Sequence, residues 1–301
     1  MRCVITGATG FIGRTLIPHL RSTGHEVIAW PRQDTFDLGH PAATPPDEWV
    51  ALLHGADAVI HLAGLAHQHT RAAAEYFRIN RDGTALLAGA AQIAGVRRFI
   101  FMSSAKVFGE GGTQIYDETS APAPMDAYAE SKWQAEQHLR ERAGCGAFEF
   151  VILRPPLVYG GDARANFGSL IRLARLPLPL PFAGVDNRRA LIGIDNLVDL
   201  IGRCLACPEA AGRTLLCADA ELYSLPAMIN AIRRALNREP GLFRIPQPAL
   251  GIIKALLGNA VSSRLFGDFR MDCSATCTLL NWSPPKSMET ILRDSFRGRV
   301  Q

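Results

Sequence analysis

The sequence predicts an α/β fold in which a parallel sheet carries helices on both of its faces. Short, nearly continuous apolar runs alternate with longer segments whose apolar residues recur at helical spacing. Strands that read as unbroken apolar runs are typical of sheets covered on both sides. A glycine-rich turn over residues 6–13 joins the first apolar run to the first helical pattern. This alternation implies βαβ units with right-handed crossovers.

The predicted elements follow the apolar patterns and the turn residues between them. We expect strands at residues 3–5, 25–30, 57–64, 97–104 and 148–153. We expect helices at residues 14–23, 47–53, 72–94 and 126–143. Ligands of such sheets bind outside the carboxyl ends of the strands. The stretches of interest all fall there: the glycine-rich turn, Arg32, and residues 63–64, 103–104 and 154–160.

The glycine-rich turn has the composition of a phosphate-binding unit. Gly7 permits the tight turn, Gly10 lets the backbone approach a pyrophosphate, and Gly13 lets the helix pack close to the strand. The helix that follows supplies backbone N–H donors and the positive end of its dipole. The spacing is G-x-x-G-x-x-G rather than the commoner G-x-G-x-x-G. The turn therefore predicts a dinucleotide site.

The composition changes after residue 160, which divides the chain into two predicted parts. Residues 1–160 form a dinucleotide-binding domain, and residues 161–301 form mainly a smaller substrate-binding lobe that prolines at 177, 179 and 181 interrupt. Residues 194–206 and 214–217 are expected to return to the sheet, so the boundary between the two parts is not sharp. The sheet is therefore expected to be completed by about residues 190–220.

Composition and charge argue against several classes of protein. The formal net charge is only +4 and the arginines are scattered, which argues against a nucleic-acid-binding or membrane-surface protein. No apolar stretch would span a bilayer and the chain enters a strand at once, so we expect a cytoplasmic protein without a signal peptide. The seven cysteines show no disulfide-like spacing. Cys204 and Cys207 have no histidine nearby, which favours buried thiols over a metal site.

Tyr128 and Lys132 form a Y-x-x-x-K pair on a predicted helix. Residues four apart share one helix face, so the phenol and the ammonium lie near each other. The pKa of a free tyrosine is about 10, and a neighbouring ammonium lowers it because it favours the phenolate. Ser104 ends a predicted strand, and its hydroxyl can share a proton transfer with Tyr128. Ser103 is the alternative to Ser104 in this role.

These features, with further motifs, give the chain a resemblance to a known family. It is identified as a member of the extended short-chain dehydrogenases/reductases, or NAD-dependent epimerases/dehydratases, and the resemblance covers nearly the whole chain. The motifs are residues 6–13 (TGATGFIG), 61–64 (HLAG), 80–84 (NRDGT), 103–109 (SSAKVFG), 128–132 (YAESK) and 154–160 (RPPLVYG). The resemblance implies a Rossmann-type sheet and a catalytic set of Ser104, Tyr128 and Lys132.

The resemblance also implies which residues line a nicotinamide dinucleotide. They are Gly7, Thr9, Gly10, Phe11, Ile12, Gly13, Arg32, Asp37, Leu38, Leu62, Ala63, Gly64, Asn80, Ser103, Lys132 and Pro155. NAD-using relatives place an acidic residue at the end of the second strand, on the ribose hydroxyls. Here Pro31 stands at that position with Arg32 beside it, and an arginine can pair with the 2′-phosphate of NADP. NADP(H) is therefore favoured, with NAD(H) as the alternative.

Within the family, the chain most resembles bacterial nucleotide-sugar enzymes of surface-polysaccharide synthesis. These are the UDP-hexose 4-epimerases and the reductases of UDP-4-keto-6-deoxy-N-acetylhexosamines. The resemblance implies that the substrate-binding residues are Lys106, Asn166, Arg189 and Arg264. Arg189 stands at a diphosphate-contacting position, and a guanidinium offers a fork of donors suited to phosphate oxygens. His61 lies in an apolar strand and is expected to be a packed strand residue.

We therefore expect an NAD(P)-dependent oxidoreductase that moves a hydride between a nicotinamide and C4 of a UDP-hexose. A 4-ketoreductase is favoured, because a reductase draws on NADPH and Arg32 favours NADP(H). A UDP-hexose 4-epimerase is the alternative that uses the same residues. A non-catalytic NADP-binding regulator is an alternative of another class, and the presence of the catalytic set argues against it. The family leads us to expect a homodimer through the helices at 72–94 and 126–143.

Overall fold

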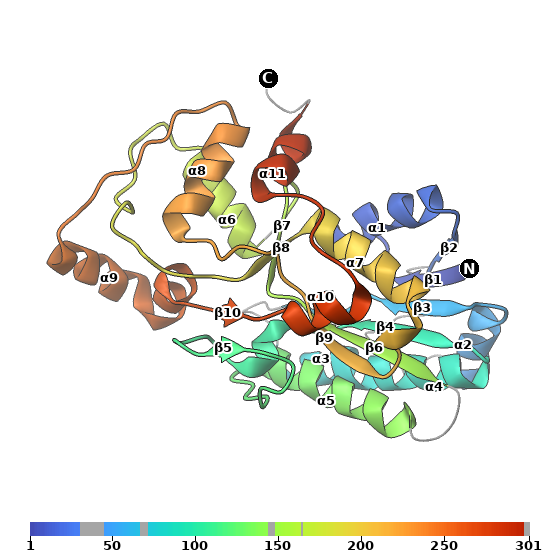
Figure 1. The fold of residues 1–301 in the computed structure, drawn as a ribbon. Coiled ribbons are helices and arrows are strands. Elements are labelled where there is room, and N and C mark those ends of the chain that lie inside the picture. The colour runs from blue at the N-terminus through green and yellow to red at the C-terminus, as the bar shows by residue number, and fades with distance from the viewer. Residues whose placement is uncertain (31–44, 67–71, 144–147, 164, 298–301) are drawn as a thin grey trace.

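Six strands form the central sheet of the molecule, in the order β2-β1-β3-β4-β6-β9 (Figure 1). The computed structural model describes residues 1–301 except 31–44, 67–71, 144–147, 164 and 298–301. The strands are β1 (Arg2–Thr6), β2 (Glu26–Ala29), β3 (Ala58–His61), β4 (Arg98–Met102), β6 (Glu149–Arg154) and β9 (Arg213–Leu216). All neighbouring pairs are parallel, so their carboxyl ends meet at one edge and the predicted fold class is confirmed.

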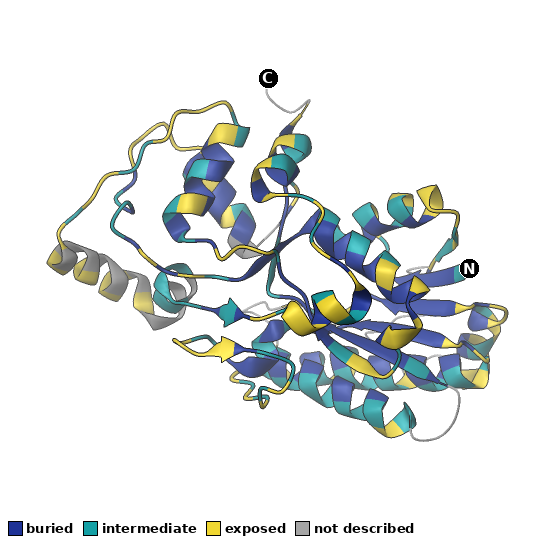
Figure 2. Ribbon diagram, in the orientation of Figure 1, coloured by how far each residue is buried: buried dark blue, intermediate teal, exposed yellow. Residues whose placement is uncertain are grey.

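Helices cover both faces of the sheet, and the strands between them are buried (Figure 2). One face carries α1 (Phe11–Ser22) and α7 (Ile194–Ala206); the other carries α2 (Pro46–Leu53), α4 (Gly83–Ile93) and α5 (Ala127–Ala143). The period of two along β1 divides its side chains between these layers. Cys3 and Ile5 join the core beneath α1 and α7, whereas Val4 joins the core beneath α2, α4 and α5.

The helix predicted at residues 72–94 is continuous, but its middle turn is wider than that of an α-helix. It consists of α3 (Ala73–Tyr76), a π-helical segment (Phe77–Asp82) and α4. Asn80 lies inside the wide turn, and the Thr84 hydroxyl donates to its carbonyl oxygen at 2.6 Å. Such widened turns occur mostly as single features inside α-helices and are frequent at functional sites. The apolar spacing predicts a helix here and does not reveal the change of pitch.

The remaining α-helices lie in the region after residue 160, and two small sheets pair strands of this region with earlier segments (Figure 1). The helices are α6 (Ala165–Ala174), α8 (Leu225–Ala235), α9 (Gln247–Phe266), α10 (Ser274–Leu280) and α11 (Met288–Phe296). The sheets pair β7 (Leu157–Tyr159) with β8 (Leu191–Gly193), and β5 (Ile115–Tyr116) with β10 (Arg270–Met271). α7 and β9 return to the main sheet, as expected for residues 194–206 and 214–217; a domain boundary at residue 160 stays a prediction.

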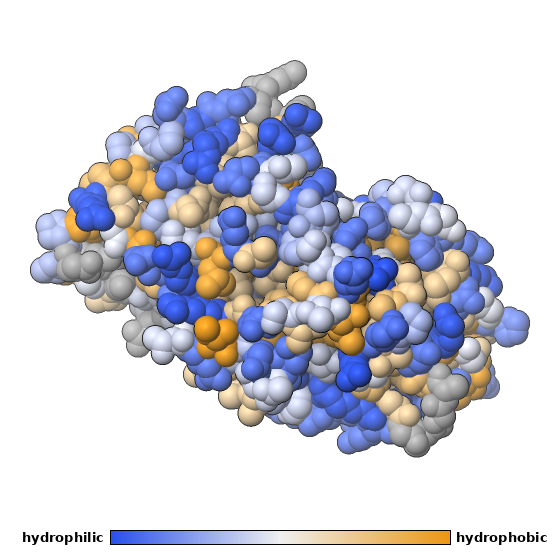
Figure 3. All heavy atoms as spheres, in the orientation of Figure 1, coloured by the Kyte–Doolittle hydropathy of each residue, from blue (hydrophilic) through white to orange (hydrophobic). Residues whose placement is uncertain are grey.

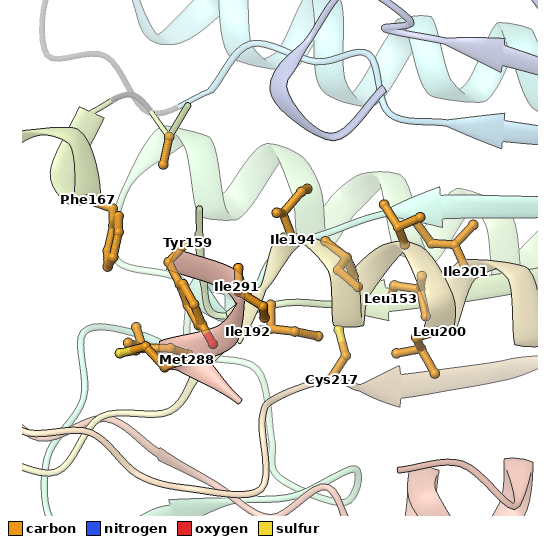
Figure 4. Packing of buried hydrophobic residues seen from close by; sticks show 14 of the residues in the cluster. Leu153, Tyr159, Phe167, Ile192, Ile194, Leu200, Ile201, Cys217, Met288 and Ile291 are labelled. Carbon is orange, nitrogen blue, oxygen red and sulfur yellow. The ribbon is translucent and has the colours of Figure 1, made fainter. Parts of the chain in front are cut away.

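An aromatic residue of β7 joins this region to the main sheet. The ring of Tyr159 packs against Phe167 of α6 at a centroid distance of 5.5 Å, and Met288 and Ile291 of α11 lie close by (Figure 4). Its hydroxyl donates to the Asp219 carboxylate at 2.5 Å, just after β9. The buried phenol therefore finds a hydrogen-bond partner, as buried tyrosines usually do.

The described residues bear on two expectations, one about membrane-spanning helices and one about the cysteines. Among its helices, none has both the length and the apolar composition that crossing a bilayer would require. The six described cysteines are free thiols, and Cys204 and Cys207 are buried, as expected. Burial raises the pKa of the Cys204 thiol to about 12, so it stays protonated and chemically quiet at neutral pH.

A matched pair of leucines tests the position of the core. Leu200 on α7 is fully buried, whereas Leu178, between α6 and β8, is 62% exposed. We expect Leu200→Ala to lower the free energy of unfolding by about 2–5 kcal/mol, because a cavity replaces a packed side chain. Leu178→Ala should change it by less than about 0.5 kcal/mol. Urea unfolding of both variants measures this, and equal losses would contradict the packing described.

Candidate active site

The glycine-rich turn is packed against the loop that follows β3. Gly7 has a φ of +70°, and a Cβ on it would lie 2.7 Å from the backbone nitrogen of Ala63. A Cβ on Gly13 would lie 2.5 Å from the carbonyl oxygen of Gly7. Both positions therefore require glycine, one for its backbone angle and both for space. The turn leaves a backbone cradle at the start of α1, which fits the pyrophosphate of a dinucleotide.

A cleft of about 830 Å³ opens beside this turn, between α1, α7 and α11. Figure 3 shows a notch between the surfaces over α11 and α1. The lining residues include Thr9, Gly10, Phe11, Arg14, Asp162 and Arg297. Three of the predicted cofactor residues thus line one cleft, while Ile12 and Leu62 pack against the hydrophobic core. The size of the cleft falls in the range usual for small-molecule sites.

His61 ties the ends of β1 and β3 to the wide turn through a chain of hydrogen bonds. Its Nδ1 lies 2.6 Å from the Thr6 hydroxyl, and its Nε2 lies 3.0 Å from the Thr84 hydroxyl. Because Thr84 donates to the Asn80 carbonyl, Thr84 accepts from Nε2–H and Nδ1 accepts from Thr6. Burial lowers the pKa of His61 to about 3, so the ring is neutral. The expectation that His61 is a packed strand residue is confirmed.

Asn80 connects the loop after β3 to helix α5. Its Oδ1 accepts from the Leu65 N–H at 2.8 Å, and its Nδ2 donates to the Leu65 carbonyl and to the Ser131 hydroxyl. The Ser131 hydroxyl donates in turn to the carbonyl of Tyr128 at 2.8 Å. Asn80, predicted to lie along a cofactor, thus holds the loop after β3 and helix α5 at a fixed distance on two sides of the candidate site.

The Ser104 hydroxyl lies beside the phenol of Tyr128, close enough to affect its pKa. Burial raises the pKa of Tyr128, the Ser104 hydroxyl lowers it, and the nearby Asp126 and Tyr76 raise it further. The sequence-based expectation was a pKa lowered by Lys132, and the net direction in the structure is the opposite. Desolvation disfavours the charged phenolate more strongly than the Ser104 hydroxyl favours it. The phenol is therefore protonated at neutral pH.

Lys132 lies one turn after Tyr128 and is buried. Its ammonium donates to the Met102 carbonyl at 2.9 Å, at the end of β4, and lies 4.7 Å from the centroid of the Phe101 ring. Burial lowers the pKa of Lys132 to about 8, and the nearby Glu136 carboxylate opposes this. A Cβ on Gly64 would lie 3.0 Å from the ammonium, so the loop after β3 passes directly over it.

Other predicted residues are placed as follows. The Ser103 hydroxyl donates to Glu136 at 2.5 Å, and the Pro155 carbonyl accepts from the Ala105 N–H at 2.8 Å. Lys106 pairs with Asp126 at 2.8 Å. Arg32, Asp37, Leu38 and the side chains of Asn166 and Arg264 lie outside the described residues.

Arg189 is turned toward backbone carbonyls at the end of α9. Its guanidinium donates to the Gly267 carbonyl at 2.7 Å and to the Ser263 carbonyl at 3.4 Å. Burial lowers its pKa. A contact to a substrate diphosphate would have to use the donors that these carbonyls leave free, so the predicted role of Arg189 stays a prediction.

Sequence reasoning missed the carboxylate of Glu136, which is buried four residues after Lys132. The signal was present, because the pattern Y-x-x-x-K continues as Y-x-x-x-K-x-x-x-E on one helix face. Ser131, which bridges Asn80 and Tyr128, was also missed. A serine inside a helix gives no pattern of its own.

Comparisons with known proteins show the family of the chain and relatives of its fold. A model of the NAD dependent epimerase/dehydratase family matches residues 3–217. The chain is 35% identical to a UDP-glucose 4-epimerase of Vibrio cholerae over 315 aligned residues, which cover 99% of this chain and 95% of that protein. Its fold is similar to that of a UDP-glucuronic acid 4-epimerase from Bacillus cereus in complex with NAD, with a TM-score of 0.76 at 21% identity over the full length of both chains. It is also similar to RMD from Pseudomonas aeruginosa complexed with NADPH, with a TM-score of 0.76 at 22% identity over 97% of this chain and 96% of that chain.

Two glycine-to-alanine changes test the cradle. We expect Gly13→Ala to weaken binding of NAD(H) or NADP(H) by about 1–3 kcal/mol, because the new methyl group would push the turn away from α1. Gly251→Ala on α9 is the matched control, since a Cβ there meets nothing within 4 Å. Fluorescence titration of each variant with both cofactors measures the effect. Equal binding by the two variants would place the dinucleotide elsewhere.

Proposed function

Because the chain belongs to the NAD dependent epimerase/dehydratase family, we propose that it catalyses hydride transfer at C4 of a UDP-hexose, with 4-epimerisation as the net reaction. The observation that carries this proposal is the placement of Tyr128 beside Ser104, one helical turn before a buried Lys132. Similarity over nearly the full length to a UDP-glucose 4-epimerase supports epimerisation over the 4-ketoreductase that the sequence alone favoured.

The backbone at the sheet edge would hold the cofactor. The cradle of Gly7, Gly10 and Gly13 presents N–H donors at the start of α1, and Asn80 and Gly64 shape the wall toward Lys132. When bound, a nicotinamide dinucleotide supplies the acceptor and donor of the hydride. Lys132, placed beneath the loop after β3, offers a cation that would hold the nicotinamide ribose.

Tyr128 would move the proton at O4 of the sugar. In the oxidation step the phenolate accepts the O4 proton, and in the reduction step the phenol returns it to the ketone oxygen. The Ser104 hydroxyl stabilises the phenolate, and the same hydroxyl can orient O4. The raised pKa of Tyr128 keeps the proton on the phenol, which suits the reduction step. The charge on Lys132 would favour the phenolate that the oxidation step requires.

A second candidate is the 4-ketoreductase, which Arg32 favours. A reductase must release its oxidised cofactor and draw on NADPH, whereas an epimerase recycles one bound cofactor. Pro31 and Arg32 replace the acidic residue that repels a 2′-phosphate in NAD-using dinucleotide folds. Both candidates use Ser104, Tyr128 and Lys132 in the same way, so the net reaction is decided by whether the cofactor is retained and whether the ketone turns its opposite face to the cofactor before the hydride returns.

The proposed function predicts interconversion of 4-epimers without net cofactor use. Purified protein should interconvert UDP-glucose and UDP-galactose, or the same pair of another UDP-hexose, with a trace of NAD or NADP. Product stereochemistry is followed by NMR and reduced nicotinamide by its absorbance. Stoichiometric oxidation of NADPH with a UDP-4-ketohexose and no epimerisation would select the reductase instead. Turnover of neither substrate class would contradict both candidates.

Tyr128→Phe tests the proton transfer. We expect kcat to fall by about 10²–10⁴-fold, because the change removes the acid–base group and leaves the ring in place. The Kd values for cofactor and UDP should stay nearly constant. Tyr116→Phe in β5 is the matched control, because its ring stacks between Phe108 and Phe269 in another cluster. A loss shared by both variants would mean that Tyr128 is not the acid.

A further inference from the structure

A carboxylate is buried directly behind the candidate catalytic residues. Glu136 lies on α5, one turn after Lys132, and its side chain has no exposed surface. It accepts from the Ser103 hydroxyl at 2.5 Å, at the end of β4. It also accepts from two nitrogens of Arg154, at the end of β6, at 3.0 and 2.6 Å. Glu136 thus joins one helix to the carboxyl ends of two strands.

Aromatic rings and a second arginine complete this cluster. The Arg154 guanidinium lies 4.8 Å from the centroid of the Phe108 ring and 5.6 Å from that of Trp133. Arg140, one turn further along α5, donates to Glu136 at 3.0 Å and to the Thr214 hydroxyl at 2.9 Å. A buried carboxylate is costly unless it is paired and hydrogen-bonded, and this one is both. Two guanidiniums around one carboxylate leave the cluster with a net positive charge.

The cluster contacts the reaction centre through two neighbours. Ser103 immediately precedes Ser104, and its backbone N–H donates to the Leu153 carbonyl at 2.8 Å, so its hydroxyl and its backbone are both fixed. Lys132 donates to the Met102 carbonyl, one residue before Ser103, and the Glu136 carboxylate, one helical turn further along α5, acts on its charge. A shift of Glu136 would therefore move the chain that carries Ser104 and change the field at Lys132.

We propose, resting on the function proposed above, that Glu136 is a positioning residue: its carboxylate fixes Ser103 beside Ser104 and holds the positive charge on Lys132. Glu136 does not reach the substrate in this role. It acts through Ser103 and Lys132, and Arg154 holds its two oxygens in place. Arg140 donates to the same carboxylate, so that its negative charge is fixed one helical turn from a buried ammonium.

The polar and charged groups around Lys132 determine the direction in which its pKa shifts when Glu136 or Arg140 is replaced. The Met102 carbonyl and the Phe101 ring contact the ammonium, Glu136 favours its charge, and His61 is neutral because its pKa is about 3. Burial already lowers the pKa of Lys132 to about 8. Removing the carboxylate charge leaves two arginines unopposed, so Lys132 should lose its proton at a lower pH. Removing the positive charge of Arg140 instead should raise the pKa of Lys132.

Lysine NMR tests this without any substrate. The chain has four lysines, so ¹³Cε-labelled lysine gives few signals, and Lys132→Arg assigns the one of interest. In Glu136→Gln we expect the Lys132 midpoint to fall by roughly one pH unit. In Arg140→Gln, which changes a half-exposed side chain and serves if the first variant does not fold, we expect it to rise. Unchanged midpoints, or shifts in the same direction, would overturn the proposal.

Turnover provides the second readout. In Glu136→Gln, kcat should fall at neutral pH and the loss of activity on the alkaline side should begin at lower pH than in the wild type, while KM for the UDP-hexose changes little. A merely structural role would lower kcat without displacing the pH profile, and that result would overturn the proposal. Shifted Lys132 midpoints in a protein without activity on any UDP-hexose would support the electrostatic role of Glu136 and refute the proposed function.

Discussion

Helix α5 buries three polar side chains, and the geometry of the candidate site depends on satisfying them. Ser131 donates to the Tyr128 carbonyl, Lys132 donates to the Met102 carbonyl, and Glu136 accepts from Arg154. Buried polar groups without partners cost about 1–3 kcal/mol each, so these bonds fix the helix against the ends of β4 and β6. Because Tyr128 lies one turn before Lys132 on the same helix, these bonds also fix its place beside Ser104.

The same rule links the candidate catalytic residues to the glycine-rich turn. The Asn80 side chain hydrogen-bonds to the Leu65 backbone and to the Ser131 hydroxyl at once, so the loop after β3 and helix α5 cannot move independently. His61 and Thr6 extend the chain of hydrogen bonds to the N–H of Ala63, against which Gly7 packs. The wide helical turn that carries Asn80 is thus placed where three segments of the sheet edge converge.

Local patterns predicted the fold, because buried strands and helix faces leave a periodic signature in the sequence. The glycine-rich turn and the spacing of Tyr128 and Lys132 were also local, and the structure brings Tyr128 together with Ser104. The pairing of Glu136 with Arg154 was not predictable in the same way, since the two lie on different elements 18 residues apart. The direction of the Tyr128 pKa was missed because burial, which dominates it, depends on packing rather than on nearby residue types.

The choice between epimerase and reductase does not lie at the reacting atoms. In the proposed function Tyr128 exchanges the same proton in either direction, with Ser104 and Lys132 beside it, and the hydride leaves or returns at the same carbon. What differs is whether the cofactor stays bound and whether the ketone turns its other face to the cofactor before the hydride returns. β2, the strand that precedes Arg32 in the sequence, is the edge strand of the sheet, two strands away from β3 and three from β4, which leads into Ser104. Under the proposal, the residue that favours one cofactor over the other therefore belongs to a different segment from the proposed catalytic residues, so that one catalytic set can serve both reactions.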